Sequence, residues 1–131
     1  MRIMIDTNIL ISAFVFKSKI MNNLINKITL EHNLLISSYC IDELKELTKE
    51  KFKIDYVELE RFLNSFPFEL AYSPEIIETK LFDIRDEDDY IILHTAIIED
   101  VDVFITGDKD FNDIKIDKPE ILTAKEFLER Y

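Results

Sequence analysis

Three short apolar runs constrain the fold of this chain more than any other feature. RIMI at 2–5, LLIS at 34–37 and VFIT at 103–106 are strand-length segments rich in branched aliphatic residues. Between them, apolar residues recur every three or four positions, as they do on one face of an amphipathic helix. Short buried strands that alternate with helices predict a mostly parallel sheet covered on both faces. We therefore expect an α/β fold with three α/β/α layers and Rossmann-like topology, in which residues 1–131 form one domain.

The same spacing predicts the other elements. Two helices are expected within 8–31, with a break near Lys17–Lys19, and a third begins after a cap at Ser37 or Ser38. Pro67 is expected to end a helix over 56–66. A capping box of Thr123 and Glu126 predicts the start of the final helix. Further helices are predicted at 74–82 and 88–99, and further strands at 68–71 and near 121.

Composition narrows the class of protein. The single cysteine, Cys40, cannot form an internal disulfide, so we expect a reducing, cytoplasmic environment. No apolar stretch approaches the ~18–20 residues that span a bilayer, and the N-terminus lacks signal-peptide features, so we expect no membrane association. The net charge is −11, from 27 acidic and 16 basic residues. This is the opposite of the basic footprint of a protein that attracts nucleic acid at long range, and it favours solubility.

Two acids follow predicted strands. Asp6 comes directly after RIMI, and Asp108 comes after VFIT and Gly107, the only glycine of the chain. Functional groups of parallel sheets collect beyond the carboxyl ends of the strands, and a glycine there suggests a turn that presents the acid. As alternatives, Asp6 caps the next helix, and Asp108 with Asp110 forms an Asp-rich turn. Thr106 offers a hydroxyl that can orient a neighbouring carboxylate.

Two more acids lie on predicted helices. Asp89 shares a helical stripe with the apolar positions Leu93 and Ala96, so its carboxylate is expected to be held against the protein. Asp86 is one turn earlier on the same side, whereas Glu87 and Asp88 are expected to face solvent.

Glu43 has two interpretations. It either faces a site or interacts with the dipole at the start of its helix. Its neighbour Asp42 lies about 100° around the helix, so only one of the two can face a given site.

Together these carboxylates suggest a metal site. Two carboxylates ~4 Å apart repel by about 1 kcal/mol in water and by roughly 4 kcal/mol at an effective dielectric of ~20. A hard cation converts this penalty into binding, and oxygen ligands favour Mg²⁺ or Mn²⁺. Cys40, His32 and His94 are too few and too far apart in sequence for a thiolate or histidine site, and His94 is expected to be a satisfied packing residue. The acids expected to share the ion are Asp6, Glu43, Asp89 and Asp108.

The motifs IDTNIL, DEL, DxxDYIILHTA and VFITGDKDF occur in an order that resembles the PIN-domain ribonucleases, over nearly the whole chain. The chain is most similar to the small single-domain members, many of which are VapC-like toxins of toxin–antitoxin pairs. This resemblance implies a PIN-like fold and a Mg²⁺- or Mn²⁺-dependent endoribonuclease that hydrolyses single-stranded RNA. The implied catalytic and metal-binding acids are Asp6, Glu43, Asp89 and Asp108, with Asp110 as a further metal ligand and Asp86, Asn8 and Thr106 as auxiliary residues.

The resemblance also implies partners. They are single-stranded RNA, an antitoxin protein encoded nearby and, since small PIN proteins often pair through helices, a second copy of the chain. Attack by water would leave a 5′-phosphate, because no histidine pair is present to promote attack by the ribose hydroxyl. Phosphate contacts are expected from basic residues at the rim of the site: Lys17, Lys45, Lys49, Arg85 and Lys109.

Two other classes of protein are alternatives to a nuclease. A catalytically inactive PIN-like binding or scaffold module remains open, although the acids are retained. A phosphoryl-accepting receiver domain needs paired acids after the first strand and a lone aspartate after the third, and IDTN and FELAYS supply neither.

Overall fold

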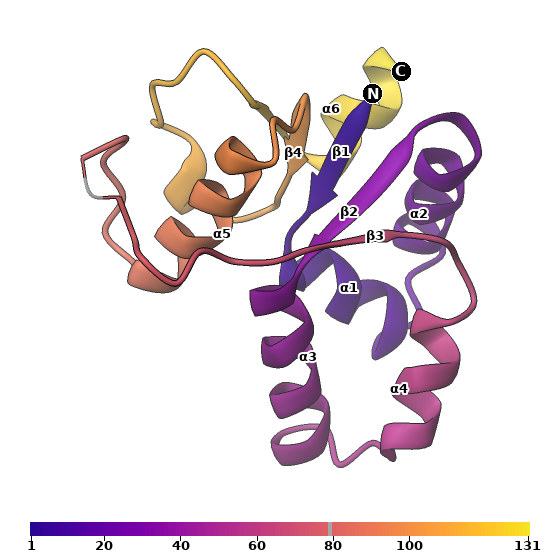
Figure 1. Cartoon of the computed structure of the whole chain (residues 1–131). Coiled ribbons are helices and arrows are strands. Elements are labelled where there is room, and N and C mark those ends of the chain that lie inside the picture. The colour runs from indigo at the N-terminus through magenta and orange to yellow at the C-terminus, as the bar shows by residue number, and fades with distance from the viewer. Residues whose placement is uncertain (79) are drawn as a thin grey trace.

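A computed structural model describes residues 1–78 and 80–131. Its strands form one sheet in the order β3-β2-β1-β4-β5, and every neighbouring pair is parallel (Figure 1). The sheet and the helices around it confirm the predicted α/β fold. The strands are β1 (Arg2–Ile5), β2 (Asn33–Ser37), β3 (Glu69–Ala71), β4 (Val103–Ile105) and β5 (Glu120–Leu122).

The helices lie on the two faces of this sheet. From β1 the chain adds β2 and then β3 on one side of the sheet, and it then crosses back to add β4 and β5 on the other side of β1. Because crossovers between parallel strands are right-handed, the helices that precede β3 and those that follow it lie on opposite faces. In Figure 1, α1 to α4 gather together and α5 lies apart from them. The helices are α1 (Thr7–Phe14), α2 (Lys19–Glu31), α3 (Ser38–Glu50), α4 (Tyr56–Leu63), α5 (Glu87–Ile98) and α6 (Ala124–Arg130), with a 3₁₀ turn η1 (Lys109–Phe111).

The core surrounds β1 and β4. Ile3, Met4 and Ile5 are fully buried, as are Phe104 and Ile105 beside them. Continuous burial along both strands is what a parallel sheet covered on both faces requires. β1 and β4 are neighbours at the point where the strand order reverses, and the crevice beyond their carboxyl ends is the usual ligand site of such sheets.

Side-chain caps start the helices near this crevice. Asp6 caps α1, and Ser37 rather than Ser38 caps α3 by accepting from the amide of Cys40 at 3.0 Å. Asp86 caps α5, and the predicted capping box of Thr123 and Glu126 is present at α6. Each cap satisfies a backbone donor that the helix itself leaves unpaired.

Two predicted helices differ from the structure. The helix predicted at 56–66 ends at Leu63, before Pro67, with Asn64 as its C-cap. The helix predicted at 74–82 is wrong for residues 74–78 and 80–82, which form bends and a turn, while Thr79 lies outside the described residues. Here the Tyr90 hydroxyl donates to the carbonyl of Glu78 and accepts from the amide of Leu81. These backbone groups therefore bond to a side chain of α5 and not to a helix of their own.

The helices and His94 were also the subject of sequence predictions. Within the described ranges, no helix is both long enough and apolar enough to cross a bilayer. His94 is buried in α5, as expected, but its Nδ1 has no hydrogen-bond partner among the described residues, so it is not the satisfied residue that was predicted.

Candidate metal centre

An acidic cleft of about 190 Å³ lies beyond the carboxyl ends of β1 and β4. Its walls come from the start of α1, from α3, from the first turns of α5 and from the segment after β4. The structure brings four predicted acids, Asp6, Glu43, Asp89 and Asp108, to this one place although they are far apart in sequence. The lining residues are Asp6, Thr7, Asn8, Glu43, Leu47, Asp86, Asp88, Asp89, Ile92 and Asp108.

Asp6 is the most deeply buried acid of the cleft, with 4% of its surface exposed. Its Oδ1 accepts from the amide of Thr7 at 2.7 Å, and its Oδ2 accepts from the hydroxyl of Thr106 at 2.7 Å. Burial raises the pKa of Asp6, the two hydrogen bonds lower it, and the charges of Asp108 and Glu43 raise it further. Asp6 therefore caps α1 and also lines the cleft, so the two interpretations of this residue do not exclude each other.

Thr106 joins the ends of the two central strands. Besides donating to Asp6, its hydroxyl accepts from the amide of Asp108 at 3.1 Å. The backbone amide of Asp6 in turn donates to the carbonyl of Ile105 at 3.1 Å. The Thr106 hydroxyl and this backbone hydrogen bond thus fix the relative position of Asp6 and Asp108.

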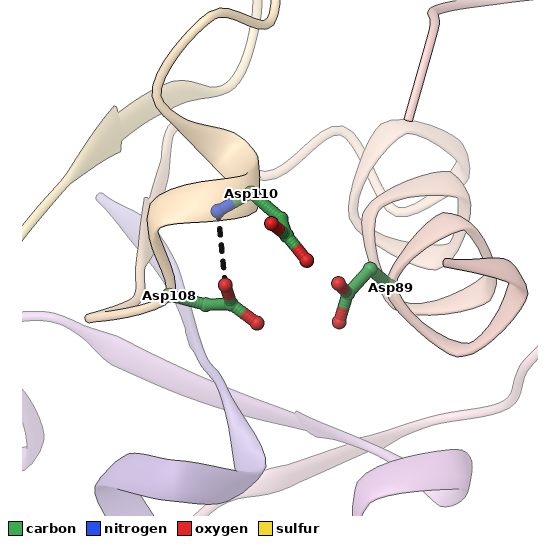
Figure 2. Close-up of side chains that lie close together, drawn as sticks. All are labelled: Asp89, Asp108 and Asp110. Carbon is green, nitrogen blue, oxygen red and sulfur yellow. Dashed lines mark hydrogen bonds between the residues drawn. The ribbon is translucent and has the colours of Figure 1, made fainter. Parts of the chain in front are cut away.

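Asp108, Asp110 and Asp89 form the tightest group of acids. Asp108 caps η1 through a hydrogen bond from the amide of Asp110 at 2.9 Å. Figure 2 shows Asp89 of α5 facing the carboxylates of Asp108 and Asp110 across the cleft. Each of the three offers one oxygen, and these oxygens all lie within 4.8 Å of one another.

The surroundings of Asp89 disfavour its ionised form. Burial raises its pKa from the ordinary value of 3.8 to about 7, and the nearby charges of Asp108, Asp86, Asp6 and Asp110 contribute in that order. A carboxyl group with this pKa is half protonated near neutrality unless a cation takes the place of the proton.

Glu43 occupies the α3 wall. It is half-buried and lines the cleft, whereas Asp42 is exposed and does not. The first turn of α3 contains no acid, so a dipole interaction in that turn does not explain Glu43. One turn before Glu43, the hydroxyl of Tyr39 lies against Asp88, and burial together with this acid raises the pKa of the tyrosine.

The remaining predicted residues are all exposed. Asp86 caps α5 through a bond from the amide of Asp88 at 2.8 Å. Asn8 is exposed and makes no side-chain hydrogen bond within the described part of the chain. Asp88, expected to face solvent, is exposed but also lines the cleft, which helical spacing alone could not show. The basic residues Lys17, Lys45, Lys49, Arg85 and Lys109 are all exposed.

Gly107 lies directly before Asp108, an acid that lines the cleft. Its φ is not positive, and a Cβ added there would meet no atom within 4 Å. The turn between Thr106 and Asp108 therefore does not need a glycine for its own conformation or packing.

The donor set fits a hard divalent cation. It consists of carboxylate oxygens, and no lysine or arginine of the described chain forms an ion pair with Asp6, Glu43, Asp89, Asp108 or Asp110. Oxygen ligands of this kind suit Mg²⁺ or Mn²⁺.

Comparison with known proteins agrees with this architecture. Residues 2–110 match the PIN domain. The chain belongs to the PIN-domain family. Among solved structures, a chain in the crystal structure of VapBC2 from Rickettsia felis, bound to a DNA fragment from its promoter, is 24% identical to this PIN domain. The match has a TM-score of 0.70 and covers 93% of this chain and 97% of that one, so the two share a fold. No curated protein matches this PIN domain significantly.

Proposed function

We propose that this PIN domain is a metal-dependent endoribonuclease that hydrolyses phosphodiester bonds of single-stranded RNA with Mg²⁺ or Mn²⁺. The observation that carries the proposal is the convergence of Asp89, Asp108 and Asp110, with oxygens within 4.8 Å, beside the buried carboxylate of Asp6. Without a cation these charges repel, and with one they form a binding site.

Acids from different walls of the cleft would hold the ion. Asp89, Asp108 and Asp110 would hold the ion, and Asp6 and Glu43 would complete its surroundings from two other walls of the cleft. When bound, a divalent ion polarises a phosphoryl oxygen and lowers the pKa of water. Hydrolysis by water would leave a 5′-phosphate and a 3′-hydroxyl.

Hydrogen bonds hold the acids in place. Thr106 and the amide of Thr7 orient both oxygens of Asp6, which keeps this carboxylate from rotating. Asp108 is fixed on both sides, by Thr106 and by the amide of Asp110. Such support limits the reorganisation needed when charge develops at the phosphate.

Substrate binding has to overcome a net charge of −11. We assign phosphate contacts to five exposed basic residues that do not line the cleft itself, so the affinity for RNA should be modest and should fall as salt rises. The basic residues assigned to this role are Lys17, Lys45, Lys49, Arg85 and Lys109.

We further propose that the protein is the toxin of a toxin–antitoxin pair. The shared fold with a chain of VapBC2 and the membership of the PIN-domain family support this assignment. The partners would then be an antitoxin protein that restrains the nuclease in the cytoplasm and a second copy of the chain. Co-expression with the small protein encoded next to it, followed by size-exclusion chromatography with light scattering, tests both partners.

A cleavage assay tests the activity. End-labelled single-stranded RNA is incubated with the protein in Mn²⁺, in Mg²⁺ and in EDTA, and the ends of the products are mapped. Asp6→Asn and Asp89→Asn should each lower the cleavage rate roughly 10²–10³-fold, the scale seen when one preorganised electrostatic contact is removed. Asp42→Asn, an exposed acid outside the cleft, is the matched control and should cleave like the parent. No cleavage in any metal would favour the inactive scaffold instead, and cleavage that persists in EDTA would contradict the metal dependence.

A further inference from the structure

Gly107 is the only glycine of the 131 residues, and nothing within the described chain requires it. Its φ lies in the region open to every residue, and a Cβ added there would meet no atom within 4 Å apart from its chain neighbours. Replacing a glycine by alanine at such a position stabilises a protein by about 0.4–1 kcal/mol, because the unfolded chain loses freedom. The glycine thus has a cost in stability that folding does not explain.

The position of Gly107 suggests what else could require it. It lies between Thr106, whose hydroxyl contacts Asp6, and Asp108, which belongs to the group of three acids. Both neighbours are fixed by hydrogen bonds, so the intervening backbone is held in place. Gly107 itself is exposed, and its amide is not paired with any group of the described chain. An exposed backbone without a side chain is a place where another molecule can approach closely.

We propose that Gly107 is a substrate-positioning residue: the sugar–phosphate backbone of single-stranded RNA passes over it, and its amide donates to a phosphate oxygen. This inference rests on the proposed function. Backbone amides commonly bind phosphate oxygens in nucleic-acid complexes without reading sequence. Gly107 directly precedes Asp108, which lines the acidic cleft. A neutral donor with no side chain beside this cleft lets a phosphodiester come near without adding further repulsion or steric hindrance.

A substitution series tests this role. Gly107→Ala and Gly107→Val add one and three carbons at the exposed position beside Asp108. Asn112→Val places the same branched side chain at an exposed position beyond the group of three acids. Three quantities are measured for each: the melting temperature with and without Mn²⁺, kcat and KM for single-stranded RNA in Mn²⁺, and the Kd for fluorescent RNA in Ca²⁺, whose looser coordination geometry disfavours turnover.

We expect KM and Kd to rise roughly tenfold in Gly107→Ala and about a hundredfold in Gly107→Val, the scale of a misplaced substrate. The Mn²⁺-dependent gain in melting temperature should stay unchanged, and Asn112→Val should behave like the parent. RNA binding and KM within about twofold of the parent in Gly107→Val would overturn the inference, whatever the nuclease activity. If the parent binds RNA but does not cleave it, the proposed function fails, and loss of binding in Gly107→Val would still support the contact.

Discussion

The two walls of the acidic cleft are built differently. The sheet wall carries Asp6 and Asp108 on the ends of β1 and β4, and the hydroxyl of Thr106 connects them. The opposite wall carries Asp89 on the first turn of α5, and the described residues of the preceding 72–86 form no helix or strand. The acids of the sheet wall are therefore held by hydrogen bonds before any ion arrives, whereas the placement of Asp89 depends on how α5 begins.

The largest effect is expected on the sheet wall. Thr106→Val leaves a buried carboxylate and the amide of Asp108 without their partner, which should lower the free energy of unfolding by about 2–3 kcal/mol. It should also reduce RNA cleavage roughly 10–100-fold, as the loss of a group that orients metal ligands does. Thr48→Val is the control, because this equally buried threonine donates only to the carbonyl of Lys45. Chemical denaturation measures the free energy of unfolding, and a cleavage assay measures the rate, for both variants. Equal effects of the two substitutions would contradict the bridging role of Thr106.

Metal binding should stabilise both walls together. Mn²⁺ at about 100 times its Kd is expected to raise the free energy of unfolding by roughly 2.7 kcal/mol. Asp108→Asn should abolish this gain and should also make the metal-free protein slightly more stable, because one repulsive charge is gone. Thermal melts in EDTA and in Mn²⁺ measure both effects. An equal gain in Asp108→Asn would mean that the ion binds elsewhere.

The pKa of Asp89 gives the α5 wall a pH dependence. Its value of about 7 in the folded protein lies above the ordinary 3.8, so the folded state holds the proton more tightly than the unfolded chain does. The stability that this group contributes is complete below pH ~4 and is lost as the pH rises through ~7. For a half-buried group screened by solvent we expect a loss of up to about 1 kcal/mol.

Asp89→Asn isolates this contribution. In EDTA, the difference in unfolding free energy between the parent and Asp89→Asn should shift in favour of the variant between pH 4 and pH 7. Urea denaturation at several pH values measures it. A difference that stays constant, or that moves in favour of the parent, would show that the pKa of Asp89 is not raised.

The smallest effect is expected at the start of α5. Asp86→Ala removes the cap and should cost about 1 kcal/mol, whereas Asp86→Ser keeps a capping oxygen and should cost only a few tenths. If both variants cleave RNA at the same reduced rate, the carboxylate of Asp86 serves the cleft. If only Asp86→Ala is impaired, the residue acts by fixing the helix that carries Asp89.

The sheet wall was the easier one to predict from the sequence. RIMI and VFIT are unmistakable buried strands, and carboxyl ends of parallel strands meet at one edge, so Asp6 and Asp108 could be expected together. The hydrogen bond from Thr106 to Asp6 joins residues 100 positions apart. From the sequence, Thr106 could be named only as a hydroxyl available to a neighbouring carboxylate.

The α5 wall was harder because side chains decide its geometry. The apolar spacing at 74–82 suggested a helix, but Ile76 is 88% exposed and the backbone near it bonds to Tyr90 instead. The contribution of Asp88 to the cleft likewise depends on how α5 is oriented, which no local pattern encodes. The position of Gly107 before an acid of the cleft could be read from the sequence, but its conformation, which needs no glycine, could not.

The order of the strands has a consequence for synthesis on the ribosome. β1 is made before β4, yet it lies at the centre of the sheet and pairs with β4, about 100 residues later in the chain. Asp6 therefore has neither its hydrogen bond from Thr106 nor the neighbouring acids until residues beyond 108 have emerged. A nascent chain therefore cannot assemble the complete acidic centre until Asp110 has left the ribosome, which limits how long the ribosome's own RNA is exposed to a finished centre.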